Sequence, residues 1–123
     1  MVKSVTSFGR SGLSDWLLQR LSAVVLLAYV LCVGGFLVLN PDLDYLQWRN
    51  YLDSMAMQVF STLALVSLIA HSWIGLWGVS TDYLTVRLLG PKATAIRMIA
   101  QAGYSIALFV FLVWGMAILW GNR

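Results

Sequence analysis

The sequence predicts an all-α membrane protein with three transmembrane helices, and three observations support this fold class. Hydrophobic residues make up 60% of the chain, while charged residues make up only 11%. A soluble domain usually carries about a quarter charged residues, so this chain has too few to cover a water-facing surface. Three uncharged runs cover residues 21–39, 54–81 and 98–122. Each run reaches about the length that crosses a hydrocarbon core, roughly 20 residues.

The remaining composition narrows the function classes. The net charge of +3 is spread over the segments between the apolar runs and forms no basic patch, so nucleic acid is a poor candidate partner. Basic residues beside membrane helices more often report topology. Cys32 is the only cysteine, which excludes an internal disulfide and any all-cysteine metal site within the chain.

The first helix is expected over residues 16–39. Ser14 or Asp15 is a suitable cap for its start, and Trp16 lies where the membrane interface favours amphipathic rings. The Asn-Pro-Asp segment at 40–42 ends it, because proline lacks a backbone donor and asparagine and aspartate favour turns. The apolar run is longer than the core of a signal peptide, about 7–15 residues, so this helix is expected to remain in the mature protein.

Two further helices are expected over residues 54–81 and 98–120, and all three helices belong to one domain over residues 1–123. Residues 40–53 are expected to form a loop whose aromatic side chains lie at the membrane interface. The Gly-Pro pair at 90–91 breaks any helix between the second and third spans. In the third helix, Gly103 and Ala107 form a small-xxx-small pattern that favours close helix contact.

The distribution of basic residues predicts the orientation of the chain. Three basic residues precede the first apolar run, one lies in the first loop, three lie in the second loop, and one ends the chain. Basic residues near membrane helices stay in the cytoplasm, so the N-terminus is expected inside and the C-terminus outside. Asp82 and Tyr83, at the end of the second helix, are then expected at the cytoplasmic surface.

His71 is the only histidine, and it lies inside the second apolar run. An ionisable ring at membrane depth is energetically costly, so His71 is a candidate functional residue. At about 100° per residue, the side chains within roughly 40° of His71 are small or acidic. They are Ala64, Ser67, Gly75, Gly78 and Asp82. We therefore expect this face to leave space in front of the histidine for a flat, wide group.

Two interpretations of this face compete. In the first, the small residues form an ordinary helix contact, and His71 hydrogen-bonds across the bundle. In the second, His71 ligates a haem iron through one ring nitrogen, and the glycines let the macrocycle lie against the helix. One histidine supplies one axial ligand, so a six-coordinate iron needs a ligand from another chain. Three helices also make a thin bundle, which points to a subunit of a larger assembly.

Asp82 and Tyr83 also have two interpretations. They are either a helix-ending aspartate and an interfacial tyrosine, or a proton-relaying carboxylate beside a phenol that donates a hydrogen bond to a carbonyl ligand. Asp82 lies about 16 Å along the helix axis from His71, at 1.5 Å per residue, which leaves room for two ligands on one helix. Arg20 opens the first helix on the same side, where it either snorkels to the interface or pairs with an anion such as a haem propionate.

Two motifs in the second helix carry a family resemblance. They read His71-x-Trp73-x-Gly75 and Val79-x-Thr81-Asp82-Tyr83. With these motifs the chain resembles the small hydrophobic membrane anchor of bacterial succinate dehydrogenase, which is respiratory complex II. The turn at 9–12, followed by Asp15 and Arg20, is similar to the start of that anchor. The likeness covers roughly residues 8–120 and is most specific from His71 to Tyr83.

The resemblance implies half of a heterodimeric bundle that binds haem b between two anchor subunits. His71 matches the axial ligand that this anchor gives to the iron. Tyr83 matches the residue that hydrogen-bonds ubiquinone, and Asp82 lies beside it in the same site. The remaining positions that it implies are glycines packing against the haem and an arginine near its propionates: Gly75, Gly78 and Arg20.

The resemblance also implies partners and a location. Succinate oxidation belongs to a flavoprotein subunit, and electrons reach the quinone through an iron–sulfur subunit, linking the citric acid cycle to the respiratory chain. Neither partner's cofactor motifs occur in this sequence, so the chain is expected to be a non-catalytic anchor in the bacterial inner membrane, with a periplasmic C-terminus.

Two other functions stay open from the residues alone. The first is the anchor of a quinol:fumarate reductase, in which the same site works in the reverse direction. The second is a small proton-coupled transporter or assembly subunit, in which His71 and Asp82 form a proton relay.

Overall fold

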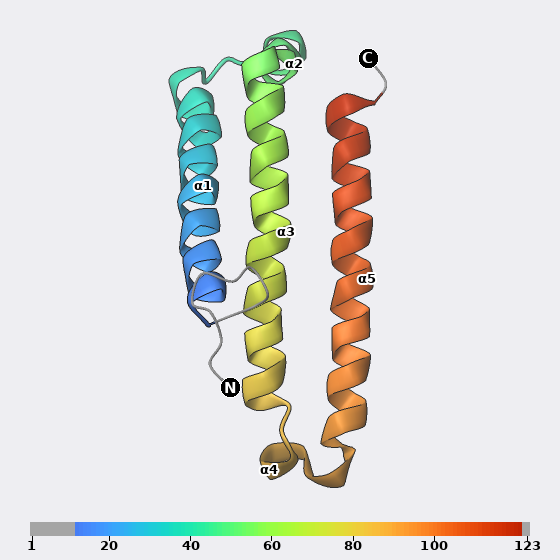
Figure 1. The fold of residues 1–123 in the computed structure, drawn as a ribbon. Coiled ribbons are helices and arrows are strands. Elements are labelled where there is room, and N and C mark those ends of the chain that lie inside the picture. The colour runs from blue at the N-terminus through green and yellow to red at the C-terminus, as the bar shows by residue number, and fades with distance from the viewer. Residues whose placement is uncertain (1–11, 122–123) are drawn as a thin grey trace.

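The computed structural model describes residues 12–121, so the predictions made on Lys3, Arg10 and, apart from Gly12, the turn at 9–12 lie outside the described residues. The described chain is helical almost throughout and contains no strand in that range. Figure 1 shows the elements in chain order. They are α1 (Gly12–Leu39), α2 (Tyr45–Asp53), α3 (Met55–Tyr83), α4 (Val86–Leu89), the 3₁₀ turn η1 (Gly90–Lys92) and α5 (Ala93–Trp120).

Three of these helices, α1, α3 and α5, are long and apolar enough to cross a membrane. The structure thus confirms the predicted all-α fold with three transmembrane helices. α3 packs against both α1 and α5, and Figure 1 shows it between them. The three helices therefore form a layer in which α3 is the shared packing surface.

At three of their ends the helices extend beyond the uncharged runs, and α3 ends at Tyr83, two residues after its run. α1 begins at Gly12 rather than at 16, and α5 begins at Ala93 rather than at 98. A helix satisfies its own backbone hydrogen bonds, so it continues into the polar region beyond the hydrocarbon core. Charge in the sequence marks the limit of the membrane-crossing segment and not the end of the helix.

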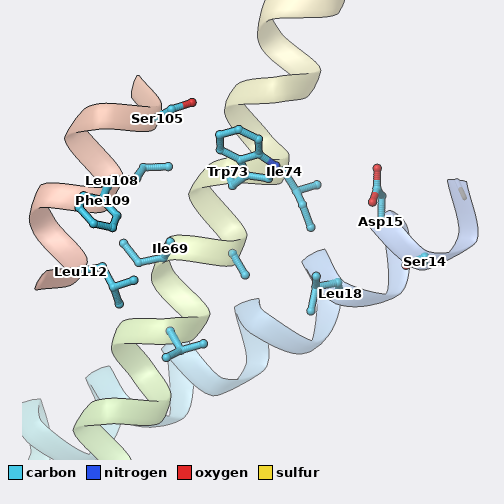
Figure 2. A pocket seen from close by; sticks show the side chains of 12 residues that line it. Ser14, Asp15, Leu18, Ile69, Trp73, Ile74, Ser105, Leu108, Phe109 and Leu112 are labelled. Carbon is cyan, nitrogen blue, oxygen red and sulfur yellow. The ribbon is translucent and has the colours of Figure 1, made fainter. Parts of the chain in front are cut away.

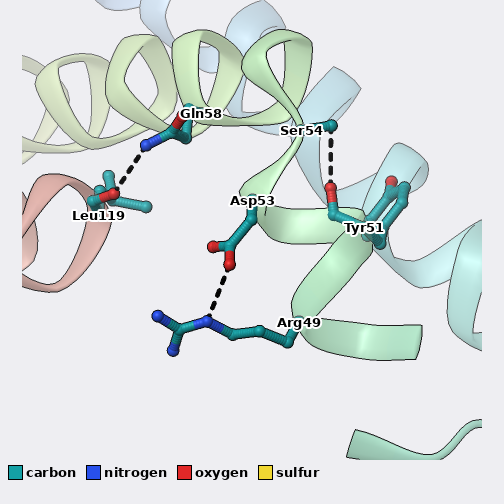
Figure 3. Close-up of polar contacts among 6 residues, drawn as sticks. All are labelled: Arg49, Tyr51, Asp53, Ser54, Gln58 and Leu119. Carbon is teal, nitrogen blue, oxygen red and sulfur yellow. Dashed lines mark hydrogen bonds and ion pairs between the residues drawn. The ribbon is translucent and has the colours of Figure 1, made fainter. Parts of the chain in front are cut away.

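The segment 40–53 is not a loop throughout, because it contains helix α2. Asp44 accepts a hydrogen bond from the backbone N–H of Gln47 at 2.8 Å, and Gln47 accepts one from the backbone N–H of Asp44 at 3.2 Å. This reciprocal capping box starts the helix. Arg49 and Asp53 then form an ion pair at 2.9 Å one turn apart, shown in Figure 3. The hydrogen bond and charge of Asp53 raise the pKa of Arg49.

Aromatic contacts hold α2 against the end of α1. The Tyr51 ring stacks on the Phe36 ring with their centroids 3.8 Å apart. The centroid of the Trp48 ring lies 6.3 Å from that of Tyr51. The Tyr51 hydroxyl donates a hydrogen bond to the Cys32 carbonyl at 3.3 Å. Burial, with the Cys32 side chain as the second cause, raises the pKa of Tyr51 to about 12. The phenol therefore stays neutral and acts as a hydrogen-bonding group of this corner.

Hydrogen bonds near both ends join α3 to α5. Gln58 donates to the Leu119 carbonyl at 3.1 Å (Figure 3), and Gln101 donates to Ser80 at 3.2 Å. Such interhelical bonds contribute about 0.6 kcal/mol each on average in a membrane. The close glycine contact differs from the prediction. A side chain at Gly103 meets nothing within 4 Å, whereas a Cβ at Gly115 would lie 2.7 Å from Leu65.

The layer buries few large apolar side chains. The buried hydrophobic residues of the described chain are Met57, Ala64 and Ala93, and no large side chain is fully enclosed. On α1 and α5, apolar residues such as Val24 and Phe109 are 64% and 67% exposed. These exposed apolar surfaces are suited to contact with lipid or with other polypeptides, because such contact removes apolar side chains from water.

Candidate functional site

The contact between α1 and α3 positions the predicted site residues. Two residues of α3 hydrogen-bond to α1. The Ser61 hydroxyl lies 2.6 Å from the Tyr29 hydroxyl, and the Nδ1 atom of His71 lies 3.0 Å from the Ser22 hydroxyl. The small residues of α3 between them are also buried, with Ala64 4% exposed and Ser67 8% exposed. This part of the small face therefore has no open space in front of it, contrary to the prediction.

His71 is half-buried and is held by a hydroxyl from the neighbouring helix. Its Nδ1 lies 3.0 Å from the Ser22 Oγ, and the same Oγ lies 3.0 Å from the Gln19 carbonyl oxygen. A serine hydroxyl carries one proton, and a carbonyl oxygen can only accept. Both contacts are satisfied when Ser22 donates to Gln19 and accepts from the Nδ1–H of His71.

This proton assignment leaves the other ring nitrogen with a lone pair. A neutral imidazole carries its proton on one nitrogen, so Nδ1–H implies an unprotonated Nε2. Nε2 makes no hydrogen bond to any residue of 12–121. His71 thus hydrogen-bonds across the helix pair, as the first interpretation expects, and still offers the nitrogen that the second interpretation requires.

Five of the predicted site residues line one pocket of about 350 Å³ between α1 and α3. They are Arg20, Gly75, Gly78, Asp82 and Tyr83. His71 is not among the lining residues, so the histidine and the pocket are neighbouring but separate features of one helix contact. The side chain of Tyr83 is 63% exposed, which leaves its hydroxyl accessible to a ligand.

The charged groups of this pocket are Asp15, Arg20 and Asp82. The Arg20 guanidinium lies over the Trp16 ring, 5.2 Å from its centroid, an arrangement that favours a cation. Within the described residues Arg20 makes no ion pair, so its guanidinium hydrogens are available to an anion.

Apart from Arg20, sequence reasoning missed the α1 side of the site. Asp15 and Gln19 line the pocket, and Ser22 holds the histidine. Their spacing of four and three residues places them on one face of α1, so a polar stripe was available as a signal. The Gln19 amide nitrogen lies 3.4 Å from where a Gly75 Cβ would be. Its Oε1 is buried and has no hydrogen-bond partner in the described structure.

A second, more apolar groove of about 470 Å³ opens on another face of α3. Figure 2 shows Trp73 and Ile74 of α3 between side chains of α1 and α5. Its polar groups are Ser14, Asp15 and Ser105, and the rest of the lining is hydrocarbon or aromatic. Nothing in the sequence patterns indicated this groove, because its lining comes from three helices.

No group of three or more histidine, cysteine, aspartate or glutamate side chains able to hold a metal ion occurs among residues 12–121. His71 is the single imidazole that the chain can contribute.

The fold and the site together define a class of protein. The chain is a multi-pass membrane protein whose middle helix combines a hydrogen-bonded histidine with a polar pocket at one end. No family model matches the chain. It is 30% identical, over 93% of both sequences, to the succinate dehydrogenase hydrophobic membrane anchor subunit of Coxiella burnetii (strain RSA 493 / Nine Mile phase I). The chain therefore belongs to the family of succinate dehydrogenase hydrophobic membrane anchor subunits.

This membership confirms the resemblance seen in the sequence motifs. It also agrees with the prediction that the chain is an anchor subunit and not itself the enzyme.

Proposed function

We propose that the chain anchors a succinate:ubiquinone oxidoreductase in the bacterial inner membrane, co-binds haem b and forms part of the ubiquinone-reduction site. The observation that carries this proposal is the arrangement of one α1–α3 contact. It presents an imidazole with a free Nε2 and, toward the end of α3, a pocket lined by Arg20, Asp82 and Tyr83.

The residues present fit a haem. The macrocycle brings four nitrogen ligands of its own, so the protein needs to supply only axial ligands. A group that brings most of its own ligands suits a chain that has one histidine and, within residues 12–121, no cluster of three or more metal-binding side chains. Arg20, with its guanidinium unpaired among the described residues, would hold a propionate. Gly75 and Gly78 add no side chain of their own, and the space at Gly78 is open within 4 Å, whereas Gln19 lies 3.4 Å from the Gly75 Cβ position.

His71 would ligate the iron through Nε2, since Nδ1–H is bound to Ser22. A bound haem b would supply a one-electron carrier whose potential depends on its axial ligands. The chain offers one histidine, so a partner anchor subunit would supply the other protein ligand of the iron.

Tyr83 and Asp82 would bind and protonate the quinone. The pocket of about 350 Å³ lies within the usual range for small-molecule sites, about 300–1,000 Å³. The phenol of Tyr83 would donate a hydrogen bond to a quinone carbonyl, and this bond strengthens as reduction makes that oxygen more negative. Asp82 lines the same pocket and would support proton delivery to the reduced oxygen.

The basic residues support an orientation for this site. Arg20 opens the first span, and Arg87, Lys92 and Arg97 lie between α3 and the apolar part of α5. Figure 1 shows the start of α1 toward the same end of the layer as α4, and α2 with Arg49 at the other end. By the positive-inside rule, the pocket faces the cytoplasm. There the soluble flavoprotein and iron–sulfur partners of the proposed complex would dock.

The test is quinone reduction by the purified complex carrying Tyr83→Phe. Loss of one hydrogen bond to the reacting carbonyl is expected to lower the rate of succinate-dependent ubiquinone reduction about 10²–10³-fold. Tyr45→Phe is the matched control, because Tyr45 is similarly exposed, at 67%, but lies in α2. Wild-type rates in both variants would contradict the quinone role of Tyr83.

The same preparation separates the alternatives. A fumarate reductase anchor is indicated if fumarate reduction by quinol exceeds succinate oxidation in the intact complex. A transporter or assembly subunit is indicated if the chain purifies without larger soluble partners.

A further inference from the structure

We infer that Ser22 is a positioning residue for the haem ligand: its hydroxyl oxygen holds the Nδ1–H of His71, which fixes the tautomer and orientation of the ring. The inference rests on the proposed role of His71 as an axial ligand. It concerns a residue of α1 that lines neither the pocket of about 350 Å³ nor the larger groove.

Ser22 is placed for this role by its burial and its distance. Its side chain is 3% exposed, and it reaches His71 from a position 49 residues away in the sequence. The contact of 3.0 Å is within the range of a direct hydrogen bond. Because the serine is buried between the two helices, solvent does not readily replace its oxygen as the acceptor.

The backbone determines which way the hydrogen bond runs. The Gln19 carbonyl takes the single proton of the Ser22 hydroxyl at 3.0 Å. The lone pairs of Oγ are then directed to His71, and the ring must present Nδ1–H to them. A ring flip about the Cβ–Cγ bond would place the carbon Cδ2 where Nδ1 now lies, and it would break the contact with Ser22.

The helix pair is braced near this contact. Tyr29 and Ser61 form a second hydrogen bond between α1 and α3 at 2.6 Å. Gln19 also approaches Gly75 closely, with its amide nitrogen 3.4 Å from the Cβ position there. This close approach lies about one helical turn from the contact of Ser22 with the imidazole, so it limits movement of the Ser22 oxygen relative to the ring, whereas the Tyr29–Ser61 bond lies further along the helix pair.

The chemical consequence follows from the direction of the bond. A histidine that donates its remote N–H to an acceptor becomes a more basic ligand through its other nitrogen. A more basic axial ligand stabilises the oxidised iron relative to the reduced iron. Loss of the acceptor is therefore expected to raise the haem midpoint potential and to weaken haem retention about 10–100-fold.

The experiment compares Ser22→Thr with Ser22→Val in the complex purified from membranes with all its subunits. Threonine and valine have similar shape and the same β-branching, but only threonine keeps a hydroxyl. The midpoint potential and the haem-to-protein ratio are measured by redox titration and absorption. Threonine is expected to match the wild type, and valine is expected to show a higher potential and faster haem loss. Equal potentials and haem contents in the two variants would overturn the inference.

Two further variants keep the result interpretable. Ser61→Ala removes another buried serine hydroxyl from the same helix contact, 4% exposed, and is expected to leave the potential unchanged. Ser22→Ala removes the acceptor without adding bulk and is expected to reproduce the valine result. If Ser61→Ala shifts the potential as much as Ser22→Ala, the effect comes from helix packing and the inference is wrong.

The failure of this inference is distinguishable from the failure of the proposed function. A haem spectrum that is lost in His71→Ala while Ser22→Ala and Ser22→Val keep wild-type potentials overturns only the role of Ser22. A haem spectrum that is unchanged in His71→Ala overturns the axial-ligand role on which the inference depends.

Discussion

His71 shows how one side chain in a membrane helix can have two partners. Its Nδ1 is used by a hydrogen bond to Ser22, and its Nε2 keeps a lone pair. A polar side chain at membrane depth is costly without a partner, and the serine meets that requirement within the chain. The nitrogen left over is the one that a metal requires, so packing and ligation do not compete for the same atom.

Gly78 provides a test of the pocket at the scale of one residue. A Cβ at Gly78 meets nothing within 4 Å, and the rest of a larger side chain would extend into the pocket that Gly78 lines with Asp82 and Tyr83. Gly78→Leu is expected to raise the KM for ubiquinone roughly tenfold, equivalent to about 1.4 kcal/mol of binding free energy. Steady-state kinetics of the purified complex measure this change.

Gly34→Leu is the matched control for that prediction. Gly34 also has nothing within 4 Å of its Cβ position, but it lies near the opposite end of α1. If Gly78→Leu and Gly34→Leu have the same KM for ubiquinone, the pocket does not bind the quinone.

The α3 side of the site was accessible from sequence, whereas on the α1 side only Arg20 was predicted. Asp82, Tyr83 and His71 stood out because each interrupts or ends an apolar run. Gln19 and Ser22 did not stand out, because α1 is apolar on most of its surface and its sequence does not define which face meets α3. Their roles depend on the rotation of α1 about its axis, which the packing of two helices determines.

At the scale of helices, the α3–α5 contact depends on Gly115. A Cβ there would lie 2.7 Å from the Leu65 side chain, closer than carbon atoms can approach. Gly115→Leu is therefore expected to destabilise the helix pair by about 1–3 kcal/mol through overpacking. A lower thermal unfolding midpoint of the purified complex would show this.

Two variants make the Gly115 prediction specific. Gly103→Leu, on the same helix with nothing within 4 Å, is expected to keep the wild-type midpoint. Adding Leu65→Ala to Gly115→Leu is expected to restore part of the lost stability, because it frees the occupied space. A Gly115→Leu midpoint equal to that of Gly103→Leu would contradict the close contact.

The helices also show what a sequence reading can miss. Small residues identify α5 as able to pack closely, but Gly103 and Gly115 point about 120° apart on a helix, and the pattern does not say which one faces α3. Helix α2 was missed for a different reason. Its aromatic residues favoured an interfacial loop, whereas Asp44 and Gln47 form the capping box that starts the helix.

At the scale of the whole molecule, the chain is a layer of three helices with large exposed apolar surfaces. Only small or flexible apolar residues are buried in the described chain. The long helices α1 and α5 each pack mainly against α3, which Figure 1 shows between them. A single histidine and a pocket open at one end give half of each proposed site. The family membership as a membrane anchor subunit is consistent with this incomplete architecture.

The central claim is that His71 holds a haem shared with a second anchor subunit. The most direct test is the reduced-minus-oxidised absorption spectrum of the complex purified with its soluble and membrane subunits, compared between the wild type and His71→Ala. The wild type is expected to show a b-type haem spectrum that is lost or strongly altered in His71→Ala, with the subunits identified in both preparations. A b-type spectrum that persists unchanged in His71→Ala would contradict it.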